Sequence, residues 1–322
     1  MSILFSADLH IKLGQKNIPR EWAKARYLGF FDEIRRLEQD VDLHIIGGDI
    51  FDRVPTMEEL ELFFTFVRGC TIPTWIYDGN HEATRKHQTF LNYLSDAVIS
   101  INDKVKIITE AWEGAYNEMG SFSILPYCEL HKKASIEMLN SSLPVFTHVR
   151  GEIPPHVAPE VDLERFNRFP VVFAGDLHSH DNCQRNIVYP GSPMTTSFHR
   201  SKVQTGVIII RDDWEWYWER LELPQLIRKT VSSTDEMIPG VFDHIIYEIE
   251  GDLDELSKVQ NSDLLDKKVV RKSSEATLFL GKDMTIIEEL AEYLTYILEL
   301  PEEKVAKIVG VFSDSTKDID VG

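Results

Sequence analysis

Leu43-His44-Ile45-Ile46-Gly47-Gly48-Asp49 is an apolar run that ends in two glycines and a carboxylate. A short apolar run bounded by turn residues is typical of a buried β-strand. Four further runs end in polar clusters in the same way: residues 3–7 before Asp8-Leu9-His10, 74–77 before Asp78-Gly79-Asn80-His81, 145–147 before His148, and 171–174 before Gly175-Asp176-Leu177-His178. The sequence therefore predicts five strands that each present reactive side chains where the strand ends.

Helical patterns separate the first of these strands. Apolar residues repeat at helical spacing over residues 22–38 and again over residues 57–67. Strands that alternate with helices indicate an α/β fold. In such sheets ligands bind at the carboxyl ends of the strands, which is where all five polar clusters are expected.

The chain beyond these motifs predicts smaller elements. Residues 205–211 and 214–223 favour a β-hairpin. Strand alternation places Trp214, Trp216 and Trp218 on one face, and core packing explains that face better than base stacking does.

We expect a domain boundary at Pro224, which divides the chain into residues 1–224, an α+β module at 225–282 and a helical segment at 283–322. The elements expected after the boundary are strands at 226–231, 245–250 and 269–272, a short helix at 253–259, and helices at 285–298 and 301–309.

The composition, with 43% hydrophobic and 27% charged residues among 322, is that of an ordinary globular protein. We expect no membrane span and no secretory signal. The three widely spaced cysteines, Cys70, Cys128 and Cys183, argue against a disulfide framework and fit a reducing cytoplasm. A net charge of −19 argues against a stand-alone nucleic-acid binder. It suggests that a partner would contribute part of the binding to any nucleic acid.

The strand-end clusters carry the ligands that two divalent metal ions need. Such a pair, about 3.5–4 Å apart, activates a water and neutralises phosphate charge during phosphodiester hydrolysis. Strand alternation puts Asp8 and His10 on the same side, and the glycines before Asp49 let its carboxylate approach both ions.

Asn80, His148 and His178 complete this set with one amide oxygen and two imidazoles. Carboxylate and imidazole ligands suit Mn²⁺, Fe²⁺ or Zn²⁺ better than Ca²⁺. His81, next to Asn80, is left to act as an acid or to contact phosphate, because the pKa of an imidazole lies near working pH.

The motifs at residues 8–10, 48–52, 79–82, 148 and 175–178, with the Tyr189-Pro190-Gly191-Ser192-Pro193 turn, resemble those of the calcineurin-like metallophosphoesterase superfamily. Within it the chain is similar to the SbcD-type DNA repair nucleases, above all to recombination endonuclease subunits of tailed phages. The resemblance covers residues 1–225 by motif and the remainder by organisation. It implies a β-sandwich flanked by helices, a small α+β capping domain and a C-terminal helix pair.

The resemblance also implies how the site works. One metal ion would be held by Asp8, His10, Asp49 and His178, and the other by Asp49, Asn80, His148 and the residue at 176. His81 would protonate the leaving oxygen or stabilise the transition state. Family members are hydrolases that prefer Mn²⁺, with Mg²⁺ as the alternative, and they cut DNA as exonucleases and endonucleases in recombination and double-strand-break repair. They act in the cytoplasm (the host cytoplasm for a phage protein), as homodimers joined to a coiled-coil ABC-type ATPase subunit.

The last motif departs from the family, which usually has G-H-x-H where this chain has Gly175-Asp176-Leu177-His178. Either Asp176 replaces the first histidine as an oxygen ligand, or the register slips and His178 pairs with His180. The strand over 171–174 favours Asp176, and a carboxylate there would favour Mn²⁺ or Mg²⁺ over Zn²⁺. Glu82 stands where the nuclease branch commonly has aspartate; either acid could orient His81.

Basic residues in or after the motif loops are candidates for phosphate contacts, with solvated loop charge as the alternative: Arg53, Arg85, Lys86 and Arg200. The helix at 57–67, together with Phe90, Leu91 and Leu94, predicts a homodimer interface or simply buried core. The C-terminal helices predict docking on a partner helix or packing against the α+β module.

Two other functions stay open. A metal-dependent phosphoprotein or small-molecule phosphoesterase would share these motifs, although the chain lacks the glycine that phosphoprotein phosphatases carry after the position of Arg53. A non-catalytic scaffold in a repair complex would have lost ligands, whereas every ligand position here carries a competent atom.

Overall fold

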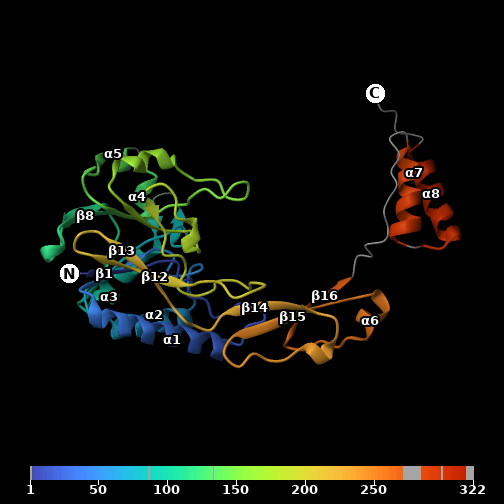
Figure 1. Cartoon of the computed structure of the whole chain (residues 1–322), viewed down its shortest axis with the longest axis horizontal. Helices are drawn as coiled ribbons and strands as arrows, with labels where there is room; N and C mark the ends of the chain where they lie inside the picture. Colours follow the sequence, from blue (N-terminus) through green and yellow to red (C-terminus); the bar gives the residue numbers. More distant parts are fainter. Residues whose placement is uncertain (1, 86–87, 133, 271–283, 299, 317–322) are drawn as a thin grey trace. The chain divides into compact units, whose positions relative to one another are not determined.

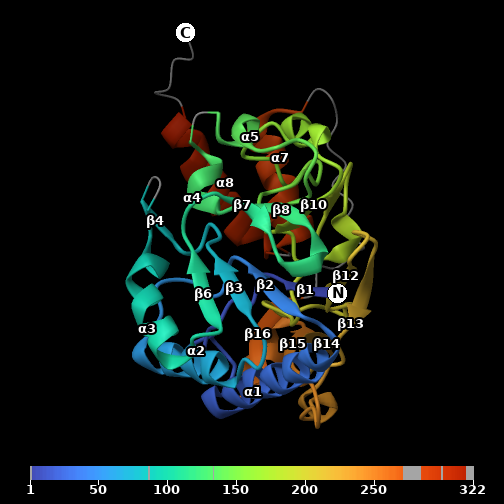
Figure 2. The same cartoon turned by 90° about the vertical axis from the view of Figure 1, so that its left-hand side faces the viewer.

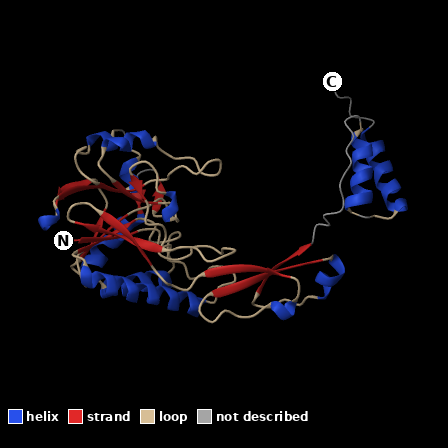
Figure 3. Ribbon diagram, in the orientation of Figure 1, coloured by secondary structure: helices blue, strands red, loops and turns tan. Residues whose placement is uncertain are grey.

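The computed structural model describes residues 2–85, 88–132, 134–270, 284–298 and 300–316. The chain forms two compact units, one of residues 1–248 with 261–267 and the other of residues 249–260 with 268–322. Figure 1 follows the chain through its elements, and Figure 3 distinguishes the helices from the strands. Among the described residues, no helix has the length and apolar character needed to cross a membrane.

A six-stranded sheet in the order β13-β12-β1-β2-β3-β6 lies in the first unit. The strands β1, β2, β3 and β6 run parallel, and β12 and β13 are antiparallel additions at one edge. The bounds are β1 (Ser2–Ser6), β2 (Leu43–Gly47), β3 (Thr74–Tyr77), β6 (Val105–Ile108), β12 (Gly206–Arg211) and β13 (Trp216–Arg220). Because the parallel strands are paired in register, their carboxyl ends reach the same edge of the sheet.

A second sheet has five strands in the order β11-β10-β9-β8-β7. All are parallel except β7, which pairs antiparallel with β8. The bounds are β7 (Trp112–Ala115), β8 (Ser121–Leu125), β9 (Val145–His148), β10 (Val172–Gly175) and β11 (Ile187–Val188). A two-stranded hairpin, β4 (Ala83–Arg85) and β5 (Gln88–Thr89), follows β3.

The two sheets pack face to face, with alternate residues of each strand meeting between them. Phe5 of β1 packs its ring 5.4 Å from that of Phe146 in β9 and 6.1 Å from that of Phe173 in β10. Leu4 points the other way and joins the core beneath the helices. The predicted β-sandwich is therefore confirmed.

Helices cover the outer faces of both sheets (Figure 2). The six-stranded sheet carries α1 (Arg20–Leu37), α2 (Met57–Gly69) and α3 (Ser95–Ile101), and the five-stranded sheet carries α4 (Tyr127–Leu130) and α5 (Ser135–Met138). The start of α2 is fixed by a capping box, in which Thr56 and Glu59 exchange side-chain and backbone hydrogen bonds. The result is the helix-flanked sandwich expected from the sequence.

The β12–β13 hairpin corrects the prediction for the three tryptophans. Trp214 lies in the turn with φ of 65°, although its ring still packs against the core between the sheets. Trp218 also packs there and donates its indole N–H to the carbonyl of Pro190 at 2.9 Å. Trp216 is 37% exposed, because β13 is the edge strand of its sheet. The core prediction is wrong for Trp216.

The remaining strands, β14 (Leu226–Val231), β15 (His244–Gly251) and β16 (Leu265–Val270), form a three-stranded sheet. The short helix α6 spans Leu253–Lys258. Later in the chain, α7 (Ile286–Glu292) continues into a π-helical turn (Tyr293–Ile297), and α8 covers Glu302–Thr316. Along the chain, the boundaries between the two units fall within β15 and β16. The three-part division at 224 and 282 stays a prediction, and residues 271–283 lie outside the described part of the chain.

Candidate metal centre

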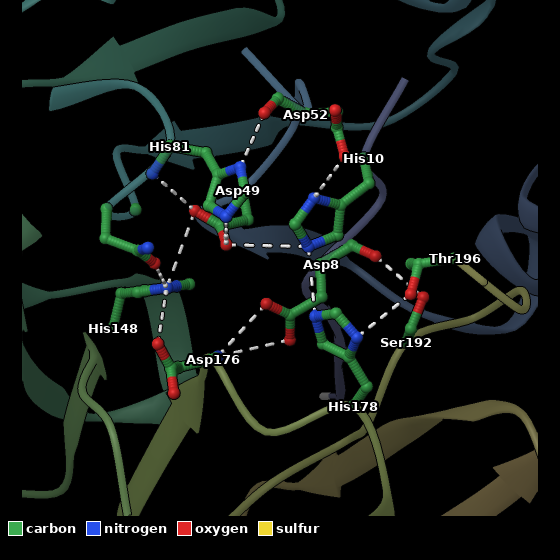
Figure 4. Close-up of polar contacts among 12 residues, drawn as sticks. Asp8, His10, Asp49, Asp52, His81, His148, Asp176, His178, Ser192 and Thr196 are labelled. Carbon is green, nitrogen blue, oxygen red and sulfur yellow. Dashed lines mark hydrogen bonds and ion pairs between the residues drawn. The ribbon is translucent and has the colours of Figure 1, made fainter. Parts of the chain in front are cut away.

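The side chains singled out by the strand-end motifs come together at one edge of the sandwich (Figure 4). Both sheets contribute to this cluster. Its members are Asp8 and His10 after β1, Asp49 after β2, Asn80 and His81 after β3, His148 at the end of β9, and Asp176 and His178 after β10. Residues far apart in the sequence are thereby placed within reach of one small ligand.

His10 and His178 face each other with their Nε2 atoms 3.0 Å apart. The carboxylate of Asp8 joins them, and ligand atoms of the three residues all lie within 4.8 Å of one another. Tyr27 fixes the backbone at His10 by donating to its carbonyl at 2.6 Å, and the hydroxyl of Thr196 lies 3.0 Å from Nδ1 of the His178 ring. Two converging ring nitrogens beside a buried carboxylate suit a shared divalent cation.

Asp49 lies between this group and a second one. Its Oδ2 is 3.5 Å from Nε2 of His10, and its Oδ1 is 3.6 Å from Nε2 of His148. The amide oxygen of Asn80 approaches the same nitrogen of His148 at 3.0 Å. Since Nδ1 of His148 donates to the carbonyl of Gly47 at 2.8 Å, its Nε2 is the acceptor in the neutral ring.

The loops that carry these ligands hold an uncommon backbone conformation. Asp8, His10, Asp49 and Asp176 all have positive φ, at 57°, 45°, 51° and 105°. Non-glycine residues rarely adopt this conformation, and such strain concentrates at functional sites. Gly48, with φ of 84°, has no room for a side chain, because a Cβ there would lie 2.6 Å from Nδ1 of His148.

Burial shifts the pKa values of carboxylates and imidazoles in the cluster. It raises the pKa of Asp8 well above its usual range, and the nearby charge of Asp49 adds to this effect. Burial also lowers the pKa of His10 and of His178, so that both rings are neutral and able to act as ligands. Buried carboxylates beside these two neutral imidazoles supply oxygen and nitrogen ligands of the kind that a divalent cation binds.

Glu82 supports the loops from beneath the cluster. Its buried carboxylate accepts hydrogen bonds from the backbone amides of Asp49, Phe51 and Gly79, each at 2.9 Å. Burial raises the pKa of Glu82 to about 8, the charge of Asp49 acts in the same direction, and the amide hydrogen bonds oppose both. Glu82 therefore fixes the backbone of the loops that carry the candidate ligands. The sequence had suggested that this acid could orient His81, but its hydrogen bonds go to backbone amides instead.

His81 is oriented by a backbone carbonyl instead. Its Nδ1 donates to the carbonyl of Asp52 at 2.6 Å, while its own backbone amide donates to Oδ1 of Asp49 at 3.0 Å. Its Nε2 lies 3.9 Å from Oδ2 of Asp49, and the side chain is 35% exposed. His10 is only 5% exposed, so His81 is the histidine that an incoming substrate reaches more readily. Ligand atoms of His81, His10 and Asp49 also lie within 4.8 Å of one another.

The structure separates Asp176 from His180. Oδ1 of Asp176 lies 3.9 Å from Nε2 of His148, beside the second group of ligands. His180 turns away, with its Nδ1 2.6 Å from the carbonyl of Tyr189 and its ring stacked on Trp218. Of the two alternatives for the last motif, this arrangement favours Asp176.

The Tyr189–Pro193 turn closes the cluster from the side of the second sheet. The hydroxyl of Ser192 donates to the carbonyl of Asp8 at 2.7 Å. Gly191, with φ of 75°, brings the turn against the carbonyl of His178. This motif therefore holds both the first and the last ligand loops in place.

Two of the predicted phosphate contacts are already paired. Arg53 lies 3.2 Å from the buried carboxylate of Glu59, and Arg200 lies 2.6 Å from that of Glu248. The side chains of Arg85 and Lys86 fall outside the described part of the structure. Among the described side chains, Arg150 also lies at the cluster, in contact with Asp176. The sequence motifs did not single it out.

Comparison with known proteins adds three relatives and one family. The model of the calcineurin-like phosphoesterase family matches residues 1–179. The chain is 39% identical over 334 residues to the probable exonuclease subunit 1 of Escherichia phage T5, with 99% of each chain covered. It is 25% identical to the putative phosphoesterase 244L of Invertebrate iridescent virus 6, covering 66% of this chain and 77% of that one. It is 24% identical to the putative phosphoesterase 078R of Invertebrate iridescent virus 3, covering 73% and 70%.

Proposed function

Because the chain belongs to the calcineurin-like phosphoesterase family and is a metal-dependent phosphoesterase, we propose that it is a two-metal DNA nuclease. The observation that carries this proposal is the convergence of carboxylates and imidazoles from both sheets, with Nε2 of His10 and His178 3.0 Å apart. The phage relative is named an exonuclease subunit, which favours a nucleic acid as the substrate.

The ligand sets follow the two groups of the cluster. One ion would be held by Asp8, His10, Asp49 and His178, and the other by Asp49, Asn80, His148 and Asp176. Ions bound there would activate a water and neutralise phosphate charge. The mixed oxygen and nitrogen ligands favour Mn²⁺, with Mg²⁺ as the alternative.

His81 is proposed as the acid that protonates the leaving oxygen. The hydrogen bond from its Nδ1 to the carbonyl of Asp52 directs Nε2 toward the cluster. Its partial exposure lets a phosphodiester approach that nitrogen. Arg53 and Arg200 would have to exchange a buried carboxylate for a phosphate to bind DNA, so we assign them a minor part.

We propose that the protein works with other subunits, as a homodimer bound to a coiled-coil ABC-type ATPase in recombination and end processing of DNA in the host cytoplasm. The word subunit in the name of the phage relative favours a partner. Exposed apolar side chains on and beside α2, at Val54 (63%) and Met57 (79%), favour the dimer. Those on the C-terminal helices, at Ile286 (71%) and Val311 (67%), favour docking of the ATPase there.

The test is nuclease activity on linear double-stranded and circular single-stranded DNA with Mn²⁺ or Mg²⁺. Asp8→Ala should lose both cleavage and metal binding, whereas His81→Ala should lose cleavage and keep metal binding. Asp235→Ala, which removes an exposed carboxylate distant in sequence from the motifs, is the matched control and should behave as wild type.

Undiminished cleavage by Asp8→Ala would sink the site assignment. A wild-type protein that hydrolyses a phosphoserine peptide but no DNA would instead favour a phosphoprotein phosphoesterase. Metal binding without hydrolysis of any phosphoester would favour the scaffold.

A further inference from the structure

We propose that Arg150 is a positioning residue that couples ion binding beside His148 to the arrival of a phosphate group, an inference that rests on the proposed metal site. Arg150 follows β9 two residues after His148. Its Nε and Nη2 lie 3.3 Å and 3.2 Å from the two carboxylate oxygens of Asp176. The guanidinium thus grips both oxygens of a residue that belongs to the proposed ligand set.

The guanidinium and an ion would compete for the same oxygen. Oδ1 of Asp176 is the atom that contacts Nη2 of Arg150, and it is also the one 3.9 Å from Nε2 of His148. Two other proposed ligand atoms lie near that nitrogen, Oδ1 of Asn80 at 3.0 Å and Oδ1 of Asp49 at 3.6 Å. A cation that uses Oδ1 of Asp176 must therefore share it with Arg150 or displace the guanidinium, and the two positive charges repel each other.

The arginine is held loosely enough to be displaced. Charge-assisted N–H···O bonds are usually about 2.7–2.9 Å long, shorter than both contacts of Arg150. Arg165 makes the same two-pronged contact with Glu137 at 2.7 Å for both bonds. In addition, the Arg150 side chain is 40% exposed, whereas that of Asp176 is 6% exposed, so the arginine is the partner with room to move.

A second carboxylate lies near Arg150. The charge of Glu160 contributes, after Asp176, to raising the pKa of Arg150. Glu160 accepts a hydrogen bond from the hydroxyl of Tyr127 at 2.9 Å through Oε2, and its buried Oε1 has no hydrogen-bond partner among the described residues. Glu160 thus adds negative charge near Arg150, so the guanidinium keeps an acidic neighbour when it leaves Asp176 and can offer its planar donors to a phosphate oxygen.

Linkage follows from this competition. A phosphate that draws the guanidinium away frees Asp176 for the ion, and an ion on Asp176 frees Arg150 for the phosphate. Each ligand must then strengthen the binding of the other by the same factor. In the absence of phosphate, Arg150 keeps the second ion weakly bound.

The experiment counts bound Mn²⁺ by electron paramagnetic resonance during titration of the full chain, with and without dimethyl phosphate as a diester probe. For the wild type we expect one tight and one weak ion, the weak one tightened about fivefold or more by the diester. In Arg150→Gln the second ion should bind about fivefold or more tightly without diester, and the diester should tighten it less than in the wild type. Arg165→Gln, which breaks a comparable pair elsewhere, should titrate as wild type.

The outcomes separate this inference from the proposed function. Equal second-ion affinity and equal diester response in Arg150→Gln and wild type would overturn the role of Arg150 and leave the metal site intact. Weaker second-ion binding in Arg150→Gln would also overturn it, since that result makes Arg150 a simple support for Asp176. No bound Mn²⁺ in the wild type would sink the metal site itself. Arg150→Lys keeps the charge without the two-pronged contact, and should fall between wild type and Arg150→Gln.

Discussion

Replacing Glu82 with glutamine tests whether a buried carboxylate holds the metal-binding loops together. In the folded protein, Oε2 accepts from the amides of Asp49 and Gly79, and Oε1 accepts from the amide of Phe51. All three partners are backbone N–H donors, so none of them can accept a hydrogen bond from a protonated carboxyl group. The substitution removes the charge and places an NH₂ group where one oxygen stood.

The size of the effect follows from these three bonds. A glutamine oxygen in the place of Oε2 keeps the bonds to Asp49 and Gly79, and its NH₂ group then faces the amide of Phe51. One bond to a charged acceptor, worth about 1.5–3 kcal/mol, is lost, and a buried donor is left unpaired. We therefore expect the free energy of unfolding to fall by about 2–4 kcal/mol in Glu82→Gln.

Urea denaturation in EDTA at pH 9, above the pKa of about 8 to which burial raises Glu82, measures this difference with the carboxylate charged and without contributions from bound ions. Glu58→Gln, which breaks an exposed ion pair with Arg20, is the control and should change the free energy of unfolding by no more than about 0.5 kcal/mol. A Glu82→Gln protein as stable as wild type at pH 9 would refute the reasoning, because it would mean that the amide hydrogen bonds to the charged carboxylate do not stabilise the loops.

Three other perturbations have defined outcomes. Gly48→Ala should abolish Mn²⁺ binding in a titration, because φ there is 84° and the new Cβ would lie 2.6 Å from Nδ1 of His148. Phe146→Ala should lower the free energy of unfolding in urea by about 3–5 kcal/mol, since the ring is fully buried between the sheets. In EDTA, the melting temperature should fall as pH rises from 6.5 to about 9. Burial lowers the pKa of His148, but the charges of Asp49 and Asp8 outweigh burial and raise this pKa from 6.5 to about 9. The proton that stabilises the folded state below pH 6.5 is therefore lost across this range. A melting temperature that rises over this range would contradict this account.

The location of the site could be predicted because its residues follow apolar runs that the sequence identifies as β-strands. Asp8, Asp49 and His148 each come after an apolar run, and parallel pairing in register brings those ends to a common edge. Local sequence thus specifies each strand, and the parallel pairing of the strands then specifies that their carboxyl ends lie together.

Arg150 could not be predicted in the same way. Its partner Asp176 is 26 residues away, and they meet because β9 and β10 pair with His148 opposite Gly175. Residues just beyond paired strand ends become neighbours only once that register is known. A charged residue after a ligand histidine therefore carries little meaning until the pairing is established.

The tryptophans show a limit of predicting burial from strand alternation. Alternation correctly relates Trp216 to Trp218, but it does not reveal that β13 is an edge strand whose first residue is left uncovered. Burial of that face depends on how far the opposite sheet and its loops extend, which is a property of the whole sandwich.

The division of the cluster between the two sheets bears on how the protein is made. Asp8, His10, Asp49, Asn80 and His81 precede β9 in the chain, whereas His148 is the last residue of β9 and Asp176 and His178 follow β10. A chain emerging from the ribosome therefore holds only part of the ligand set until residue 178 has been added and the second sheet has paired. Under the proposed assignment of ligands, we therefore expect hydrolysis of phosphoesters only from the completed fold.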